Sequence, residues 1–101
     1  MTFDDLRAYC RANGDDPEAV EKFIAWAECN IQIWKFFEAV ALEQMANEPK
    51  GDPMICMGTL RKRNGVMVPN ACAPGLSRMF NTKYRRHFFQ VNQMKTFKAA
   101  A

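Results

Sequence analysis

The stretch from Pro17 to about Ala46 constrains the fold of this chain more than any other part of the sequence. After Pro17 it contains neither glycine nor proline, so no residue in it forces a helix to end. Its apolar residues recur on one stripe of a helix with 3.6 residues per turn, which predicts one long central helix. The stripe consists of Val20, Phe23, Ile24, Ala27, Ile31, Trp34, Ala41, Leu42 and Met45.

The C-terminal part of this predicted helix is apolar on more than half of its circumference. Outside the main stripe it carries Trp26, Ile33, Phe36, Phe37 and Val40. Such a helix must lie at the centre of a small core or be covered by a partner. The core helix is the interpretation we favour. The alternatives are the groove of a partner protein and a homodimer that forms through Trp26, Ile33 and Phe37.

Glu38 lies in the middle of the apolar stripe, between Trp34 and Leu42 on the helical wheel. A buried carboxylate is costly unless it is paired or hydrogen-bonded, so Glu38 either bonds a cation from the basic C-terminal half of the chain or marks a place where the stripe opens to solvent. We favour a structural ion pair over catalysis, because one carboxylate without a second acid-base group makes a poor active site.

The residues before the central helix predict a short first helix. Thr2 followed by Asp5 has the form of a helix cap with an acidic first turn, and Asn13-Gly14 supplies an end, which places the helix over about 3–13. Asp16 is then the N-cap of the central helix, with Pro17 at its first position.

The pattern changes after the turn-forming residues 47–53. Two short apolar runs, 54–57 and 66–68, lie on either side of an Asn64-Gly65 turn signal. Together they predict a β-hairpin or wing-like loop, with a basic tip at residues 61–63.

A last helical region begins at Pro74. Its apolar side is predicted to hold Leu76, Phe80, Tyr84, Val91 and Met94, opposite a cluster of arginines. The alternative is two shorter helices with a break near Tyr84, because Asn81-Thr82 has weak helix propensity. The expected fold is therefore mainly α with a small β-hairpin (α+β): a short N-terminal helix, a long central helix, a hairpin or wing, and a basic C-terminal helical region. We expect one domain over 1–98, and we interpret Ala99-Ala100-Ala101 as a tail of the kind that joins a protein to a purification tag.

Charge is unevenly divided along the sequence. Residues 1–46 contain four Lys/Arg and nine Asp/Glu, whereas residues 47–101 contain ten and two. A basic half of this density attracts phosphates or an acidic protein. No apolar run approaches the roughly 20 residues of a membrane helix, and the first residues lack the order of a signal peptide. We therefore expect a soluble cytoplasmic protein that does not bind membranes.

The sequence contains no pattern that indicates catalysis. It lacks a Gly-rich phosphate loop, a nucleophile with a base at a motif spacing, and a CxxC pair. A zinc site made of Cys56, Cys72 and His87 would have only three ligands at spacings that match no compact pattern. We expect no enzyme activity, cofactor or metal, and four reduced, mostly buried thiols at Cys10, Cys29, Cys56 and Cys72.

The candidate functional site combines two basic clusters. The first is the predicted hairpin tip, and the second lies on the terminal helical region. The residues are Arg61, Lys62, Arg63, Arg78, Lys83, Arg85, Arg86 and Lys95. A basic helix lying along a groove, with a basic wing on the backbone, is the arrangement of winged-helix DNA binding. A solvated basic face is the alternative.

Two stretches of the chain resemble small uncharacterised phage and prophage proteins. Residues 34–42 read W-K-F-F-E-A-V-A-L, which is similar to the pattern W-x-x-F-E-x-x-A-L of those proteins. The Asn-containing turn at 68–70, the segment 76–80 with Arg78 and Phe80, and the paired aromatics in 87–89 complete the resemblance, which spans about 31–90. The chain departs from the family in its turn-rich 49–63 and in having Gln90-Val91-Asn92 in place of an arginine.

The resemblance implies a phage-type accessory protein of helical winged-helix character. Its apolar positions would belong to the core: Trp34, Phe37, Ala41, Leu42, Phe80, Phe88 and Phe89. Arg78 would be either the partner of Glu38 or a nucleic-acid contact. Two functions follow as hypotheses. The first is binding of the nucleic-acid backbone, DNA or RNA, through the basic surface. The second is a phage-encoded inhibitor, anti-defence or anti-CRISPR-like, that binds an acidic host protein through the same surface.

Overall fold

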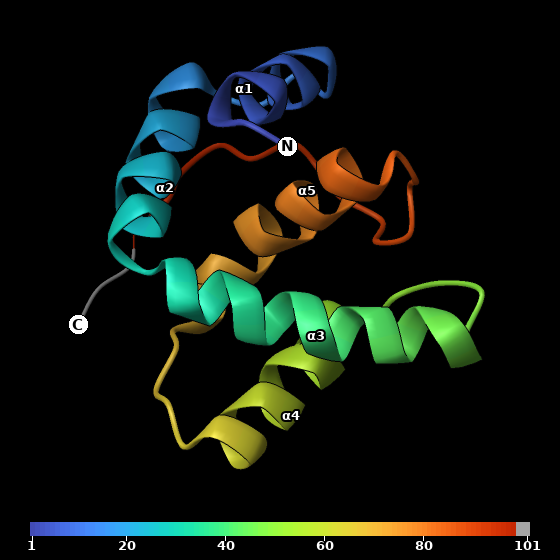
Figure 1. Ribbon diagram of the computed structural model, residues 1–101. Coiled ribbons are helices and arrows are strands. Elements are labelled where there is room, and N and C mark those ends of the chain that lie inside the picture. Colours follow the sequence, from blue (N-terminus) through green and yellow to red (C-terminus); the bar gives the residue numbers. More distant parts are fainter. Residues whose placement is uncertain (99–101) are drawn as a thin grey trace.

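The structure is a computed structural model that describes residues 1–98, and it is helical (Figure 1). Its elements in chain order are α1 (Phe3–Ala12), α2 (Pro17–Cys29), α3 (Ile31–Asn47), α4 (Pro53–Asn64), the 3₁₀ turn η1 (Asn70–Cys72) and α5 (Ala73–Tyr84). Helix α5 runs through the middle of the molecule, between α1 and α2 on one side and α3 and α4 on the other. The predicted tail at 99–101 lies outside the described residues.

The predicted starts of α1 and of the central helix are confirmed. Thr2 and Asp5 form a reciprocal capping box at the start of α1. Asp16 accepts a hydrogen bond from the Ala19 amide at 2.9 Å, and Pro17 occupies the first turn of α2. Side-chain caps of this kind satisfy backbone N–H groups that have no partner within the helix.

The predicted single helix over 17–46 is two helices, because Asn30 ends α2 and starts α3. The Asn30 side chain donates to the Trp26 carbonyl at 2.8 Å, a local bond that competes with helix continuation. A straight helix over 17–47 would be about 46 Å long at about 1.5 Å per residue. The largest extent of the molecule is 32 Å, so the chain must turn for both halves to reach one core.

The predicted β-hairpin is wrong. Residues 54–57 and 61–63 belong to helix α4, residues 66–68 lie in the irregular loop after it, and no strand occurs in residues 1–98. Asp52 caps this helix by accepting from the Met54 and Ile55 amides at 3.0 and 3.2 Å. Gly65 ends it in the left-handed region at φ 63°. The Asn64-Gly65 pair, which predicted a hairpin turn, is instead the glycine C-cap of a helix.

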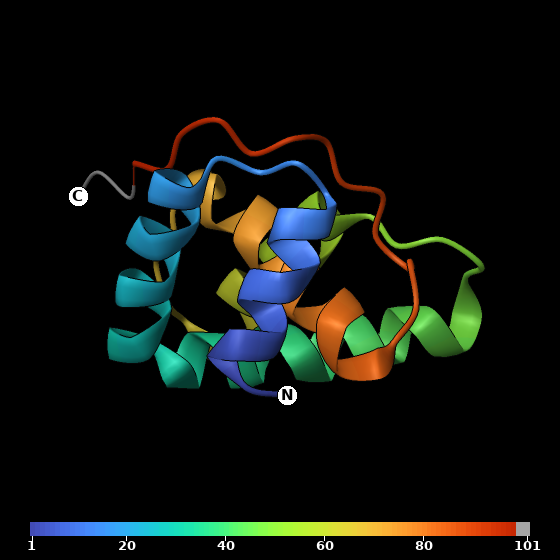
Figure 2. The same ribbon diagram turned by 90° about the horizontal axis from the view of Figure 1, so that it is seen from above.

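The C-terminal helical region ends earlier than predicted. Helix α5 stops at Tyr84, and residues 85–98 form an irregular segment that returns across α1 and α2 (Figure 2). Val91 and Met94 therefore do not share a helix face with Leu76. The segment still contributes to the core, because it buries Phe88, Phe89, Met94 and Phe97.

The core is built on aromatic rings that meet from distant parts of the chain. The Phe89 ring lies 5.5 Å from that of Phe37 and 5.4 Å from that of Phe80, centroid to centroid. Of the core positions implied by the resemblance, all are buried except Leu42, which is 38 % exposed. This exception lies on the outer side of α3.

The predicted dimer face is internal. Phe37 is fully buried, and Trp26 and Ile33 are partly buried against the core. The Phe97 ring covers Trp26 at a centroid distance of 6.4 Å, so the C-terminal segment occupies the place that we assigned to a second copy.

Candidate functional site

The predicted basic site does not form one surface. Residues 61–63 lie in the last turn of α4, and Lys83 and Arg85 lie at the end of α5. In Figure 1 these two helices end at opposite corners of the molecule, the yellow end of α4 at lower left and the orange end of α5 at upper right. Lys95 belongs to the returning C-terminal segment.

Two of the three basic residues in α4 form hydrogen bonds or ion pairs with other parts of the molecule. The Arg61 guanidinium donates to the Val68 carbonyl at 3.1 Å and to the Asn70 side chain at 2.6 Å, which fixes the loop after α4. Arg63 forms an ion pair with Glu43 of α3 and holds the pKa of that carboxyl below its usual value. Only Lys62 of this cluster is exposed without such a partner among residues 1–98.

Arg78 is a structural residue, because it is 2 % exposed and paired with the fully buried Asp15 carboxylate. Its Nε lies 2.7 Å from Asp15 Oδ2, and it also donates to the Pro74 and Asn92 carbonyls. Burial works to raise the pKa of Asp15, but hydrogen bonds from Arg78, the Met94 amide and Asn13 hold it below its usual value. Arg78 therefore cannot contact nucleic acid or pair with Glu38.

Glu38 is paired with Lys83, which confirms the predicted structural ion pair. The Tyr84 hydroxyl also donates to Glu38, at 2.6 Å. Burial works to raise the pKa of Glu38, but the bonds from Lys83 and Tyr84 outweigh it and lower the pKa. Burial and the bond to Glu38 in turn raise the pKa of Tyr84 to about 12.

The remaining predicted arginines lie together at the end of α5. Arg85, Arg86 and His87 line a shallow hollow of about 370 Å³, with Tyr9, Asn81 and Thr82 on its other sides. No carboxylate lines the hollow, and neither arginine forms an ion pair within residues 1–98. We call residues 85–87 the basic turn.

The walls of the hollow are joined by polar contacts. The Tyr9 hydroxyl lies 3.2 Å from His87 Nδ1 and accepts from the Asn81 side chain at 3.0 Å. Asn81 also donates to the Phe89 carbonyl at 2.8 Å, which holds the chain after the basic turn. Tyr9 was not among the predicted site residues, because it meets His87 across 78 positions of the chain.

Arg85 has an unusual backbone for its residue type. Its φ is 52°, and it is the only residue other than glycine with a positive φ in residues 1–98. This position after a helix is commonly glycine, since a side chain there crowds the backbone. A cation at a helix C-terminus recovers roughly 0.3–1 kcal/mol from the helix dipole, which offsets part of the strain.

Comparisons of the chain with known protein families, with curated proteins and with solved structures find no match. Among residues 1–98, no group of three His, Cys, Asp or Glu side chains is arranged to hold a metal ion. None of the helices described for the chain combines the length and the apolar composition needed to cross a bilayer.

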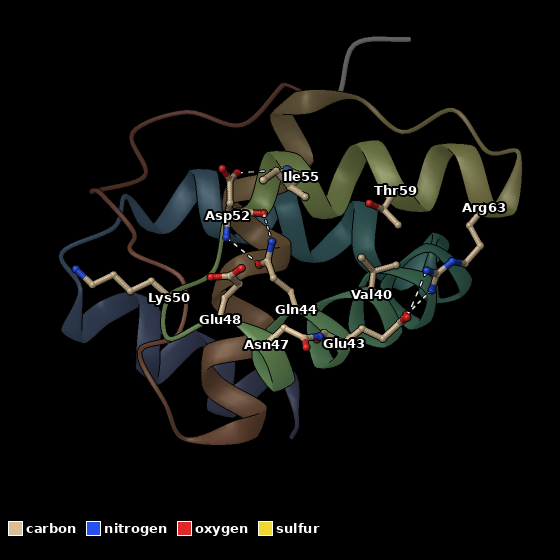
Figure 3. A pocket seen from close by; sticks show the side chains of 10 residues that line it. All are labelled: Val40, Glu43, Gln44, Asn47, Glu48, Lys50, Asp52, Ile55, Thr59 and Arg63. Carbon is tan, nitrogen blue, oxygen red and sulfur yellow. Dashed lines mark hydrogen bonds and ion pairs between the residues drawn. The ribbon is translucent and has the colours of Figure 1, made fainter.

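A separate groove of about 530 Å³ lies between α3 and α4 (Figure 3). Val40 and Ile55 form its apolar surface, and the Glu43–Arg63 ion pair stands at one end. Glu48, Lys50 and Asp52 lie toward the other end. No sequence pattern indicated this groove, because one of its walls, α4, was predicted to be a hairpin.

Proposed function

We propose that this chain is a small phage-type accessory protein that binds the nucleic-acid backbone through its basic turn. The observation that carries the proposal is the pair of exposed arginines, Arg85 and Arg86, beside a hollow without carboxylates. Guanidinium groups bind phosphate oxygens with two parallel hydrogen bonds, and they are favoured wherever phosphate must be held in one orientation.

The chemistry of the hollow suits phosphate rather than bases. His87 and the Tyr9 hydroxyl add short polar groups beside the two guanidinium groups, whereas the Thr82 hydroxyl donates to the Arg78 carbonyl at 2.7 Å. Reading base edges requires long side chains that project together into a groove, and the buried Asn81 and Arg78 are occupied inside the molecule. The proposed binding is therefore insensitive to sequence.

The test is fluorescence anisotropy with labelled duplex and single-stranded DNA and with RNA at 50 mM salt. We expect dissociation constants of roughly tens of micromolar, within the range of non-specific binding. The double reversal Arg85→Glu/Arg86→Glu should weaken binding at least tenfold. The control Lys35→Glu/Lys50→Glu lies on α3 and the loop after it, and it changes the net charge by the same amount as the first variant. It should weaken nucleic-acid binding much less. Equal losses in both proteins, or no binding by the wild type, would contradict the proposal.

The second candidate is a phage-encoded inhibitor that docks the basic turn on an acidic host protein. The small number of free cations favours it, because one or two arginines can dominate a protein interface whereas tight DNA binding uses many phosphate contacts. We expect the wild type, but not Arg85→Glu/Arg86→Glu, to retain a bacterial protein from nuclease-treated lysate. This result together with no binding in the anisotropy assay would select the inhibitor function.

A further inference from the structure

The first two turns of helix α4 expose apolar side chains to solvent. Residues 53–60 carry no charged side chain. Cys56, Met57 and Leu60 face the core and are fully buried, while Met54 is 45 % and Ile55 60 % exposed. A surface helix normally has a polar outer face, and a helix that is apolar all round is normally covered.

Gly58 lies at the middle of this outer face. A Cβ built at Gly58 meets no atom within 4 Å, so the monomer leaves space there. Its φ is not positive, and glycine within a helix is unfavourable relative to alanine, so the backbone of the monomer does not require it. A small residue at this place lets a second helix approach closely.

The two ends of α4 carry opposite charges. Lys62, seven residues after Ile55 and therefore on the same side of the helix, is exposed without an ion pair in the described chain. Asp52 and Glu48 lie beside the start of α4. Lys50 is also near this end, but its side chain extends away from α4 in Figure 3.

We propose that this face is the interface of a symmetric homodimer, in which α4 packs antiparallel against α4 of a second copy. A twofold axis near Gly58 places Ile55 against the aliphatic stem of Lys62 from the other copy. The same packing brings each Lys62 ammonium toward the carboxylates of Asp52 and Glu48 at the start of the opposite helix. Each contact occurs twice, which is the self-complementarity that a twofold interface requires.

We expect the dimer to be weak and to exchange rapidly with the monomer. Helix α4 has 12 residues and is about 18 Å long at about 1.5 Å per residue, so the face is smaller than a standard protein interface. We expect a dissociation constant of roughly tens of micromolar, as for interfaces at the low end of the size range.

Sedimentation velocity of the full chain between 5 and 500 μM tests the proposal. The wild type should shift from monomer to dimer, and Ile55→Asp should remain monomeric at 500 μM with an unchanged circular dichroism spectrum. The control Leu42→Asp places the same charge on a partly exposed apolar position of α3 and should leave dimerisation intact. A wild type that is monomeric at 500 μM overturns the proposal and leaves the face to a helix from another protein.

A charge exchange tests the antiparallel arrangement. Lys62→Glu and Glu48→Lys should each weaken the dimer at least threefold, and the double variant should recover most of the loss. A double variant weaker than both single variants would overturn this arrangement. The Arg85→Glu/Arg86→Glu protein should dimerise like the wild type, so failure of the dimer and failure of nucleic-acid binding are distinguishable.

Discussion

Asp15 is the residue on which the position of the C-terminal segment most depends. Its carboxylate accepts from the Arg78 guanidinium and from the Met94 amide at 2.7 Å, and the neighbouring Asp16 amide donates to the Met94 carbonyl. One buried anion thereby joins the α1–α2 turn, α5 and the returning segment. Local sequence patterns could predict the cap at Asp16, but not Asp15, whose partners are 63 and 79 positions away.

We expect Asp15→Asn to destabilise the fold strongly. Removing one charge of a buried pair leaves the other uncompensated and costs about 3–5 kcal/mol. Urea denaturation at pH 7 measures this loss. Asp4→Asn, which removes an exposed partner of Arg7, is the control and should change the free energy of unfolding little.

The same residue predicts an acid-sensitive stability. Because the folded-state pKa of Asp15 is depressed, its stabilising contribution is present above the unfolded-state pKa of about 3.9 and is lost as the pH falls through the folded-state value. Wild-type stability should therefore fall as the pH is lowered below about 5, and Asp15→Asn should show a shallower dependence. Parallel pH profiles for the two proteins would contradict this role.

Thiol reactivity provides a further test at the residue scale. Burial raises the pKa of Cys10 and Cys56 to about 12 and that of Cys72 to about 11, whereas Cys29 is exposed. Because the thiolate is the reactive form, Ellman's reagent at pH 8 should modify one thiol quickly in the native protein. All four should react after denaturation. Fast reaction of a second native thiol would show that the core is more open than described.

Helix α4 shows where pattern-based prediction fails at the scale of an element. Apolar residues lie on both its inner and outer faces, so the sequence lacks the 3.6-residue period that identifies a surface helix. An Asn-Gly pair such as Asn64-Gly65 is common both at the end of a helix and in a hairpin turn. The pair therefore does not distinguish a helix from a hairpin at this place in the sequence. By contrast, α1 and the start of α2 carry side-chain caps that specify a helix locally, and both were predicted.

Two glycine substitutions test the helices in opposite directions. Gly58→Ala in α4 should stabilise the monomer by about 0.5–1 kcal/mol, because its Cβ meets open space. Gly75→Ala in α5 should destabilise it, since the new Cβ would lie 2.2 Å from the Phe23 ring. Thermal unfolding at low protein concentration, where the monomer dominates, measures both. A lower Tm for Gly58→Ala would show that α4 is not the solvent-facing helix described here.

At the scale of the whole molecule, the fold converts a charge gradient along the sequence into charges at helix ends. Acidic residues lie in the first turns of α1 and α2, and basic residues lie in the last turns of α4 and α5, where each sign is favoured by the helix dipole. Three of the eight cations of the predicted site are neutralised by ion pairs within the molecule. They are Arg63, Arg78 and Lys83, which pair with Glu43, Asp15 and Glu38. The sequence showed the number of cations, but their pairing depends on contacts between distant segments.

The salt dependence of DNA binding tests the central claim most directly, because it counts the phosphates that the protein neutralises. Two phosphate contacts, from Arg85 and Arg86, predict a slope of about −2 when the logarithm of the association constant for duplex DNA is plotted against the logarithm of the salt concentration. The variant Arg85→Glu/Arg86→Glu should lose most of this slope. A slope near −5, which corresponds to about six contacts, would mean that the separated cations bind together and would contradict the proposed confinement to the basic turn.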